Sequence, residues 1–274
     1  PHFDADTVLQ QLPRSTVMMG VPTFYTRLLD RPDFTRDLCD NMRLFVSGSA
    51  PLLAETHIEF EQRTGHRILE RYGMTETGMI TSNPYDGERI AGTVGYALPG
   101  ESVRIADDDG NEIARGETGV LEVKGPNVFQ GYWRMPEKTR DEFREDGWFI
   151  TGDLATMSDD GRVTIVGREK DLIISGGYNI YPKEIELAID ECDGVKESAV
   201  IGTPHADFGE GVVAVVVRGD NMDINEDDIL QSLSSQLARF KQPKRIFFVD
   251  ELPRNTMGKV QKNTLREDYR DCLK

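Results

Sequence analysis

The feature that most constrains the fold of this chain is an alternation of helix and strand patterns over residues 1–100. Helical periodicity is present in "DADTVLQQL" and "LLAETHIEFEQRTG". Short apolar stretches with the length of strands accompany them: "TVMMGVP", "RLFVSGS" and "RILERYG". Such alternation is typical of βαβ units, in which helices connect parallel strands of one sheet. The sequence therefore predicts an α/β fold that begins with part of a large αβ domain containing a parallel sheet.

The pattern changes near residue 101. Asp-Gly turns separate short strands over residues 101–168, which predicts a β-rich subdomain, either a small β-barrel-like segment or a bent sheet. The strand and helix patterns that follow predict a compact α+β C-terminal domain. The charged stretch "GREKD" (167–171) is the expected linker, so we expect one domain over residues 1–169 and a second over residues 170–274.

Charge and cysteine usage exclude several classes of protein. Asp and Glu number 48 against 32 Lys and Arg, a formal charge of −16, whereas nucleic acids and anionic membranes require a basic surface. The three cysteines, Cys39, Cys192 and Cys272, form no CxxC pair, and the four histidines have no metal-binding spacing. We expect a cytoplasmic protein that binds neither nucleic acid nor membranes. Because the chain opens at Pro1 without a methionine, we also expect an N-terminal part of the same protein to precede it.

The stretch "ERYGMTETG" (70–78) places an aromatic ring, a glycine, a hydroxyl and a carboxylate within five positions: Tyr72, Gly73, Thr75 and Glu76. One interpretation is a helix start capped by Thr75. The other is the floor of a nucleotide site. These residues alone leave both open, because a short motif match is only a hypothesis.

Five further stretches each have a structural and a ligand-binding interpretation. "VSGSAPL" (46–52) is either a turn capped by Ser49 or a backbone that passes close to a flat ligand. "FITGDLA" (149–155) places Asp153 in a turn, where a carboxylate either stabilises the turn or accepts hydrogen bonds from ribose hydroxyls. The other three supply a cation or paired glycines: Arg168 in "GREKD", Gly176 and Gly177 in "ISGGYNIYP", and Lys259 in "PRNTMGKVQKN". Their structural alternatives are a surface salt bridge, a plain hairpin and a solvated loop lysine.

In order and spacing these motifs resemble the adenylate-forming superfamily of acyl-CoA synthetases, firefly luciferase and peptide-synthetase adenylation domains. The matching stretches are "SGSAPL", "RYGMTE", "TGD", "GREKDLIISGGYNIYPKEIE" and "PRNTMGKVQK". Within the superfamily, four stretches look most like malonyl-CoA or methylmalonyl-CoA synthetases: "GVPTFYTRLL", "SGSAPL", "VFQGYWRMPEKT" and "NTMGKVQKNTLRE". The resemblance implies an ATP-dependent, AMP-forming acid–thiol ligase that uses Mg²⁺, ATP and coenzyme A and prefers malonate or methylmalonate.

The resemblance also assigns site residues. Those implied to bind ATP or AMP are Ser49, Ala50, Pro51, Glu70, Arg71, Tyr72, Gly73, Met74, Thr75, Asp153, Arg168 and Lys259. Tyr72 would stack on adenine, and Asp153 would hold the ribose. Thr75, Glu76 and Lys259 would be catalytic: Thr75 at the α-phosphate, Glu76 as the Mg²⁺ ligand, and Lys259 in adenylation only.

For transfer to coenzyme A, the resemblance implies that a small mobile C-terminal domain rotates about a hinge at Lys170. Gly176 and Gly177 would line the tunnel for the pantetheine arm. Lys262 is expected to lie outside the site.

The chain lacks one motif that a complete ligase of this family contains. The family's glycine- and hydroxyl-rich phosphate loop is absent from these 274 residues, so we expect it in the N-terminal part and expect the fragment alone to be inactive.

A dicarboxylate substrate needs a cation for its distal carboxylate, for which Arg27, Arg43 and Arg71 are candidates. The alternatives are an acyl- or aryl-CoA ligase of other specificity, a carrier-protein adenylating module, and a noncatalytic nucleotide-binding fragment.

Overall fold

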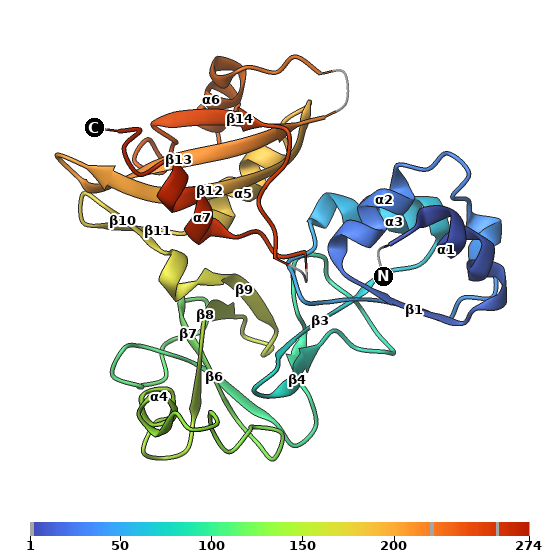
Figure 1. Cartoon of the computed structure of the whole chain (residues 1–274). Helices are drawn as coiled ribbons and strands as arrows, with labels where there is room; N and C mark the ends of the chain where they lie inside the picture. Colours follow the sequence, from blue (N-terminus) through green and yellow to red (C-terminus); the bar gives the residue numbers. More distant parts are fainter. Residues whose placement is uncertain (1–2, 220–221, 256–257, 274) are drawn as a thin grey trace. The chain divides into compact units, whose positions relative to one another are not determined.

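The computed structural model describes residues 3–219, 222–255 and 258–273. The chain divides into two compact units, Pro1–Ile165 and Val166–Lys274 (Figure 1). The predicted division into domains at residues 169 and 170, with a mobile second domain, remains a prediction.

The first sheet of unit 1 has five strands in the order β1-β2-β3-β4-β5. They are β1 (Val17–Gly20), β2 (Leu44–Ser47), β3 (Leu69–Met74), β4 (Gly78–Ser82) and β5 (Tyr96–Ala97). The pairs β1–β2 and β2–β3 are parallel, which agrees with the predicted parallel sheet. The pair β3–β4 is antiparallel, because a short turn joins these strands directly, and the pair β4–β5 is antiparallel as well.

Helices pack on this parallel part of the sheet around an aromatic core. The α-helices are α1 (Ala5–Gln11), α2 (Pro22–Leu29) and α3 (Ala54–Thr64), with short 3₁₀ helices at Leu12–Arg14 and Arg36–Cys39. Tyr25 of α2 and Phe45 of β2 both meet the ring of Phe60 of α3, at centroid distances of 5.4 and 4.8 Å. All three side chains are fully buried, so these rings fix the helices against the sheet.

The second sheet has the order β6-β7-β8-β9, and the chain passes from unit 1 into unit 2 within β9. Its strands are β6 (Ser102–Ala106), β7 (Gly119–Lys124), β8 (Phe149–Met157) and β9 (Val163–Arg168), and α4 (Pro136–Asp141) lies between β7 and β8 in sequence. Within the described residues this sheet is open, so the expected barrel-like segment is not a closed barrel. Glu122 of β7 is fully buried and is satisfied by Arg104 and Arg144, each 2.8 Å from a carboxylate oxygen.

Unit 2 is an α+β unit, as the sequence predicts. Its strands are β10 (Ile173–Ser175), β11 (Tyr178–Ile180), β12 (Val195–His205), β13 (Gly209–Arg218) and β14 (Arg245–Val249). They form one sheet in the order β11-β10-β13-β12, in which β14 pairs in parallel with β13. The helices are α5 (Pro182–Asp190), α6 (Glu226–Ser234) and α7 (Lys262–Asp268), and a 3₁₀ helix covers Glu169–Asp171.

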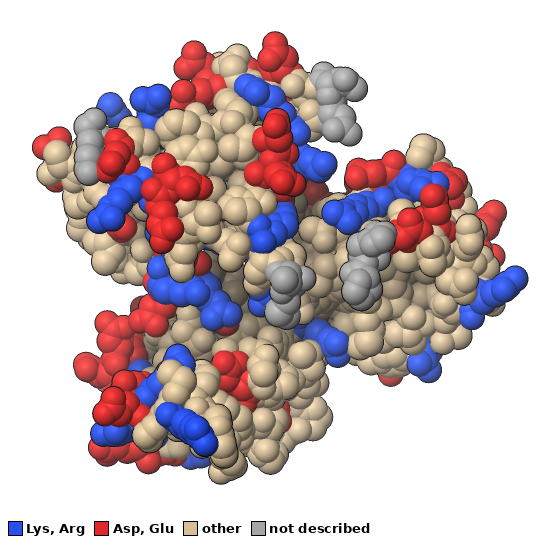
Figure 2. Space-filling model, viewed as in Figure 1, with Lys and Arg blue, Asp and Glu red and all other residues tan. Residues whose placement is uncertain are grey.

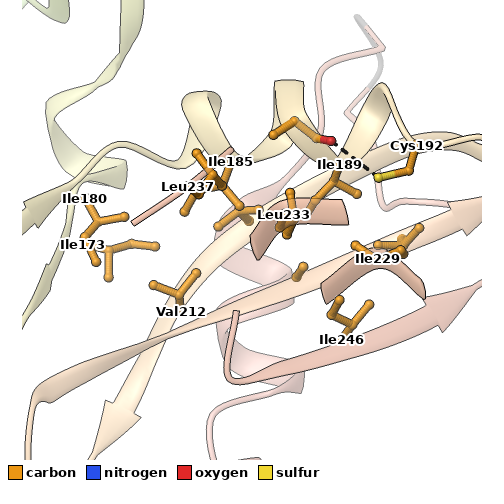
Figure 3. Close-up of a cluster of buried hydrophobic side chains, with 14 residues drawn as sticks. Ile173, Ile180, Ile185, Ile189, Cys192, Val212, Ile229, Leu233, Leu237 and Ile246 are labelled. Atoms are coloured by element: carbon orange, nitrogen blue, oxygen red, sulfur yellow. Dashed lines mark hydrogen bonds between the residues drawn. The ribbon is translucent and has the colours of Figure 1, made fainter. Parts of the chain in front are cut away.

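The apolar run of β13 is explained by burial on both faces of this sheet. Val212, Ala214 and Val216 belong to a core with residues of α5 and α6, including Ile185 and Ile229 (Figure 3). The alternate residues of β13, Val213, Val215 and Val217, belong to a second core with Leu265 of α7. Because successive side chains of a strand point to opposite faces, only a continuous apolar run can supply both cores.

Acidic and basic side chains are interspersed on the face shown in Figure 2. Among the described residues, no helix combines the length and apolar character needed to cross a bilayer.

Candidate active site

The "ERYGMTETG" motif forms a strand, a tight turn and the start of the next strand. β3 ends at Met74, residues 75–77 form the turn, and β4 begins at Gly78. The backbone N–H of Thr77 donates to the carbonyl of Met74 at 3.2 Å, and Thr75 is exposed in the turn. The helix start capped by Thr75 is therefore wrong. Gly73 is required where the two strands meet, because a Cβ there would lie 2.1 Å from the carbonyl oxygen of Gly78.

Tyr72 and Asp153 meet between the two sheets of unit 1. The hydroxyl of Tyr72, on β3, donates a hydrogen bond to the carboxylate of Asp153, which is 3% exposed on β8. The backbone N–H of Asp153 also donates to the hydroxyl of Thr151 at 3.1 Å. Asp153 thus lies inside a strand, and the expected turn at this position is wrong. An aromatic ring beside a fixed carboxylate is an arrangement that can hold a base and a ribose.

Glu70 points into the interior of unit 1. Its Oε1 lies 3.3 Å from Nδ1 of buried His57 and accepts the backbone N–H of Gly92 at 3.3 Å. Burial raises the pKa of Glu70, and the interaction with His57 opposes that rise. The carboxylate of this β3 residue is therefore occupied by contacts in the interior of unit 1. Any contact of Glu70 with a nucleotide would have to come from its backbone.

A cavity of about 280 Å³ lies at the end of the parallel strands. Its lining includes Gly48, Ser49, Arg71 and Gly73, which belong to the predicted site or flank it. Ser49 has φ of 69°, a left-handed conformation that is uncommon for a residue with a side chain. Helix α3 begins only at Ala54 with Leu53 as its N-cap, so the expected capping role of Ser49 is wrong.

The remaining cavity residues were not predicted as site residues: Met19, Gly20, Val21, Phe24, Val46 and Met79. The "MGVPTF" turn from β1 into α2 could have indicated the first four, because ligands of open α/β sheets bind at the carboxyl ends of parallel strands. Ala50 and Pro51 are exposed in the loop that follows Ser49, and Met74 is half-buried at the end of β3. Of the three candidate arginines, Arg71 lines this cavity, whereas Arg27 and Arg43 are exposed.

Glu76 is held by a tyrosine that sequence reasoning missed. The hydroxyl of Tyr132 lies 3.1 Å from Glu76 Oε1 and 2.5 Å from Glu142 Oε2. Burial, the hydrogen bond to Glu142 and the charge of Glu76 raise the pKa of Tyr132, so its hydroxyl stays protonated. Tyr132 lies in the quoted "VFQGYWRMPEKT" stretch, but no sequence pattern pairs it with a residue 56 positions earlier.

Glu76 suits a magnesium ion that is held mainly by substrate. Mg²⁺ prefers carboxylate and phosphate oxygens and keeps several waters, so one or two protein carboxylates suffice. The described residues contain no group of three or more His, Cys, Asp or Glu side chains that could hold a metal alone. A half-buried carboxylate such as Glu76 fits the first arrangement.

In unit 2, the predicted hinge and glycine pair lie in short local structures. Arg168 is the half-buried last residue of β9, and Lys170 is exposed within the 3₁₀ helix that follows. Gly176 and Gly177 form the two-residue turn between β10 and β11, with φ of 57° and 83°. Positive φ at both positions is the geometry of a hairpin turn that glycine adopts without strain, so the hairpin interpretation of this pair is confirmed.

An exposed aromatic side chain lies beside that turn. The backbone N–H of Gly176 donates to the carbonyl of Phe208 at 2.9 Å, and Phe208 is 42% exposed. The Lys244 ammonium lies 5.2 Å from the centroid of the Phe208 ring. A ring and a cation next to a glycine turn can accept a base and a phosphate, and sequence reasoning missed both residues.

Lys259 is exposed on a loop that the structure describes up to residue 255 and again from residue 258. Its backbone N–H donates to Asn255 Oδ1 at 2.9 Å, and the Asn255 N–H donates to the Lys259 carbonyl at 2.9 Å. The next lysine in the chain differs sharply. Nζ of Lys262 lies 2.6 Å from Oε1 of Glu186, which is 8% exposed. Lys262 is therefore part of the packing of unit 2.

Comparison with known families identifies both units. Residues 1–133 match the family described as "AMP-binding enzyme", and residues 184–259 match "AMP-binding enzyme C-terminal domain". A long-chain-fatty-acid–CoA ligase of Yersinia pestis is 40% identical over 254 residues, covering 92% of this chain and 45% of that protein. The mitochondrial malonate–CoA ligase ACSF3 of Mus musculus is 39% identical over 301 residues, covering 97% of this chain and 52% of that protein.

Solved structures agree with these matches. The crystal structure of ATP-bound MatB from Rhodopseudomonas palustris has a TM-score of 0.97 and 63% identity, covering 100% of this chain and 55% of that chain. The chain thus spans about half the length of the relatives it matches. The two matching families and this shared fold show that the chain belongs to the AMP-binding enzyme family.

Proposed function

We propose that the full-length protein is an ATP-dependent acyl-CoA ligase that activates malonate or methylmalonate as an acyl-adenylate and transfers the acyl group to coenzyme A. The family and the names of relatives, all CoA ligases among those cited, support the reaction class. The mouse relative named as a malonate–CoA ligase supports the acid. A cytoplasmic location stays a prediction from cysteine usage.

The observation that carries the malonate proposal is the position of Arg71 on a small cavity, and in this proposal Arg71 binds the acid rather than ATP or AMP. At about 280 Å³ the cavity is slightly smaller than the usual range for ligand sites, about 300–1,000 Å³. Apolar side chains such as Phe24 and Met79 line the cavity. Among its described lining residues, Arg71 is the one with a cationic side chain. A planar guanidinium binds a carboxylate through two hydrogen bonds, which suits the distal group of a short dicarboxylate.

In the first half-reaction, a carboxylate oxygen attacks the α-phosphorus of ATP and pyrophosphate leaves. Tyr72 would hold the adenine ring, Asp153 the ribose, and Thr75 the α-phosphate. When bound at Glu76, Mg²⁺ would supply charge that offsets the phosphate oxygens. Lys259 would bring a second positive charge to the atoms where negative charge accumulates. Arg168 would contact the ribose or a phosphate.

In the second half-reaction, the coenzyme A thiol attacks the acyl carbonyl and AMP leaves. Rotation about Lys170 would move Lys259 out of the active site and bring the turn at Gly176 and Gly177 into it. Because glycine has no side chain, this turn leaves room for the pantetheine arm. The exposed ring of Phe208 and the Lys244 ammonium are suitable partners for the nucleotide end of coenzyme A.

The second candidate is a ligase for longer or aryl acids. It is favoured by relatives of similar identity, a long-chain-fatty-acid–CoA ligase and an indoleacetate–CoA ligase of Aromatoleum aromaticum, the latter 38% identical. A carrier-protein adenylating module and a noncatalytic nucleotide-binding protein are the remaining alternatives.

The test is a panel of acids offered to the full-length protein with ATP, Mg²⁺ and coenzyme A, followed by AMP release and acyl-CoA formation. We expect malonate or methylmalonate to be preferred over acetate, benzoate and palmitate. Arg71→Gln should lower kcat/KM for malonate by about 10–100-fold and that for acetate much less, because one charged hydrogen-bonding partner is lost. Arg14→Gln, an exposed arginine in a 3₁₀ helix, is the matched control.

Preference for palmitate or an aryl acid would contradict the malonate proposal and support the second candidate. Adenylate formation without acyl-CoA would support the carrier-protein module, and failure to release AMP with any acid would support the noncatalytic alternative.

A further inference from the structure

Tyr132 lies between two carboxylates that compete for its single proton. Its oxygen is 2.5 Å from Glu142 Oε2 and 3.1 Å from Glu76 Oε1, and a hydroxyl has one hydrogen to donate. Nζ of Lys138 lies 2.5 Å from Glu142 Oε1, so the charge of Glu142 is compensated from its other side. Within the described residues, Glu76 accepts a side-chain hydrogen bond from the Tyr132 hydroxyl and forms no salt bridge, so its negative charge is left for a cation outside this cluster.

The segment that carries Tyr132 is fastened to the turn that carries Glu76. The backbone N–H of Phe129 donates to the Glu76 carbonyl at 2.8 Å, and Asn127 Nδ2 donates to the Thr77 carbonyl at 2.8 Å. The Tyr132 ring packs edge-on against Phe129 at 4.8 Å. Its backbone N–H donates to Thr139 Oγ1 at 2.9 Å. The Tyr132 hydroxyl is therefore held in place independently of its bond to Glu76.

We propose that Tyr132 is a positioning residue for Glu76, orienting this carboxylate for the divalent cation that accompanies ATP. Glu142, already paired with Lys138, is the competing acceptor for the hydrogen bond of the Tyr132 hydroxyl. The proposal rests on the proposed function, because it takes Glu76 as the Mg²⁺ ligand. Partners that orient a metal-binding carboxylate typically contribute about 10–100-fold to metal affinity.

The test is binding of Mn²⁺ to the full-length protein in the presence of ATP, with free Mn²⁺ measured by electron paramagnetic resonance. Tyr132→Phe keeps the ring and removes the hydroxyl, so Mn²⁺ affinity should fall about tenfold. The Mg²⁺ concentration for half-maximal adenylation should rise by a similar factor, excess Mg²⁺ should restore the rate, and the KM for the acid should not change. Tyr96→Phe, which removes a hydroxyl bonded to Asp160 at 2.7 Å, is the matched control and should bind Mn²⁺ normally.

Glu142→Gln provides an independent check, because it keeps the hydroxyl beside Glu76 and removes only the competing charge. Its Mn²⁺ affinity should stay within about threefold of the wild type. Unchanged Mn²⁺ affinity in Tyr132→Phe would overturn the proposal, as would a loss in Glu142→Gln as large as that in Tyr132→Phe. Failure of the wild-type protein to form acyl-CoA would instead overturn the proposed function, and the Mn²⁺ measurement would still decide the role of Tyr132.

Discussion

The hydroxyl of Tyr72 donates a hydrogen bond to the buried carboxylate of Asp153, which joins β3 of one sheet to β8 of the other within unit 1. This bond holds the ring proposed for adenine beside the carboxylate proposed for the ribose. It therefore links the geometry of two proposed nucleotide contacts that are 81 residues apart in sequence.

Replacing Asp153 tests this pair. Asp153→Asn keeps the size of the side chain and removes its charge, so we expect the KM for ATP to rise about tenfold or more, the usual effect of losing a charged hydrogen-bond acceptor. Steady-state kinetics of AMP release by the full-length protein measure this. Asp160→Asn is the control, since Asp160 is an exposed carboxylate that also accepts from a tyrosine hydroxyl. An unchanged KM for ATP in Asp153→Asn would remove Asp153 from the nucleotide site.

Lys170 offers a test of the hinge. Lys170→Pro restricts the backbone at an exposed position of the 3₁₀ helix, so it should spare acyl-adenylate formation and slow thioester formation by at least about tenfold. Lys170→Ala leaves the backbone free to rotate, so it should support both steps. Single-turnover assays of each half-reaction separate these outcomes, and equal loss of both steps in Lys170→Pro would show that the residue is not a hinge.

Asp190 makes the stability of unit 2 depend on pH. Burial raises the pKa of Asp190 to about 7, and the hydrogen bond from Ser198 and the charge of Lys183 only partly oppose this. Asp190 is the last residue of α5, and a negative charge is unfavourable at the C-terminal end of a helix. Its Oδ1 atom has no hydrogen-bond partner among the described residues. Because the folded pKa lies above the unfolded value of about 3.9, the folded chain binds the proton more tightly. Stability should therefore fall as pH rises from about 4 to about 7.

The check is the melting temperature of the full-length protein and of Asp190→Asn between pH 5 and 8. The variant should be more stable than the wild type at pH 8, by about 1–2 kcal/mol, and the difference should shrink toward pH 5. Asp193→Asn, at an exposed neighbouring position, should show no such trend. Equal pH dependence in wild type and Asp190→Asn would show that Asp190 does not titrate in this range.

Local patterns predicted most elements, because the periodicity of a helix or strand is recorded in adjacent residues. The apolar run of β13 indicated a strand, and its burial on both faces became clear only in the structure. Gly176–Gly177 indicated a hairpin as one of two interpretations. Asp153 was expected in a turn because Gly-Asp is a turn pair. In the structure β8 continues through it, since β7 pairs with β8 on both sides of this point.

The side-chain partners could not be predicted in the same way. Glu70 was assigned to the nucleotide site by its place in a motif, but its pairing with buried His57 depends on how α3 packs on β3. Tyr132 and Glu76 meet through a segment 56 residues away. Such contacts follow from tertiary packing, which no pattern within a short stretch records.

The most direct test of the account is the separation of the two half-reactions in Lys259→Ala of the full-length protein. The ion pair of Lys262 with Glu186 makes Lys262 an unsuitable control, because its removal would leave a buried carboxylate unpaired. Exposed Lys196 is the matched control, and Lys196→Ala should leave both steps unchanged. Lys259→Ala should reduce ATP-dependent adenylate formation by about 10²–10³-fold, yet convert supplied acyl-adenylate and coenzyme A to thioester at the normal rate. Normal adenylation by Lys259→Ala would contradict the account.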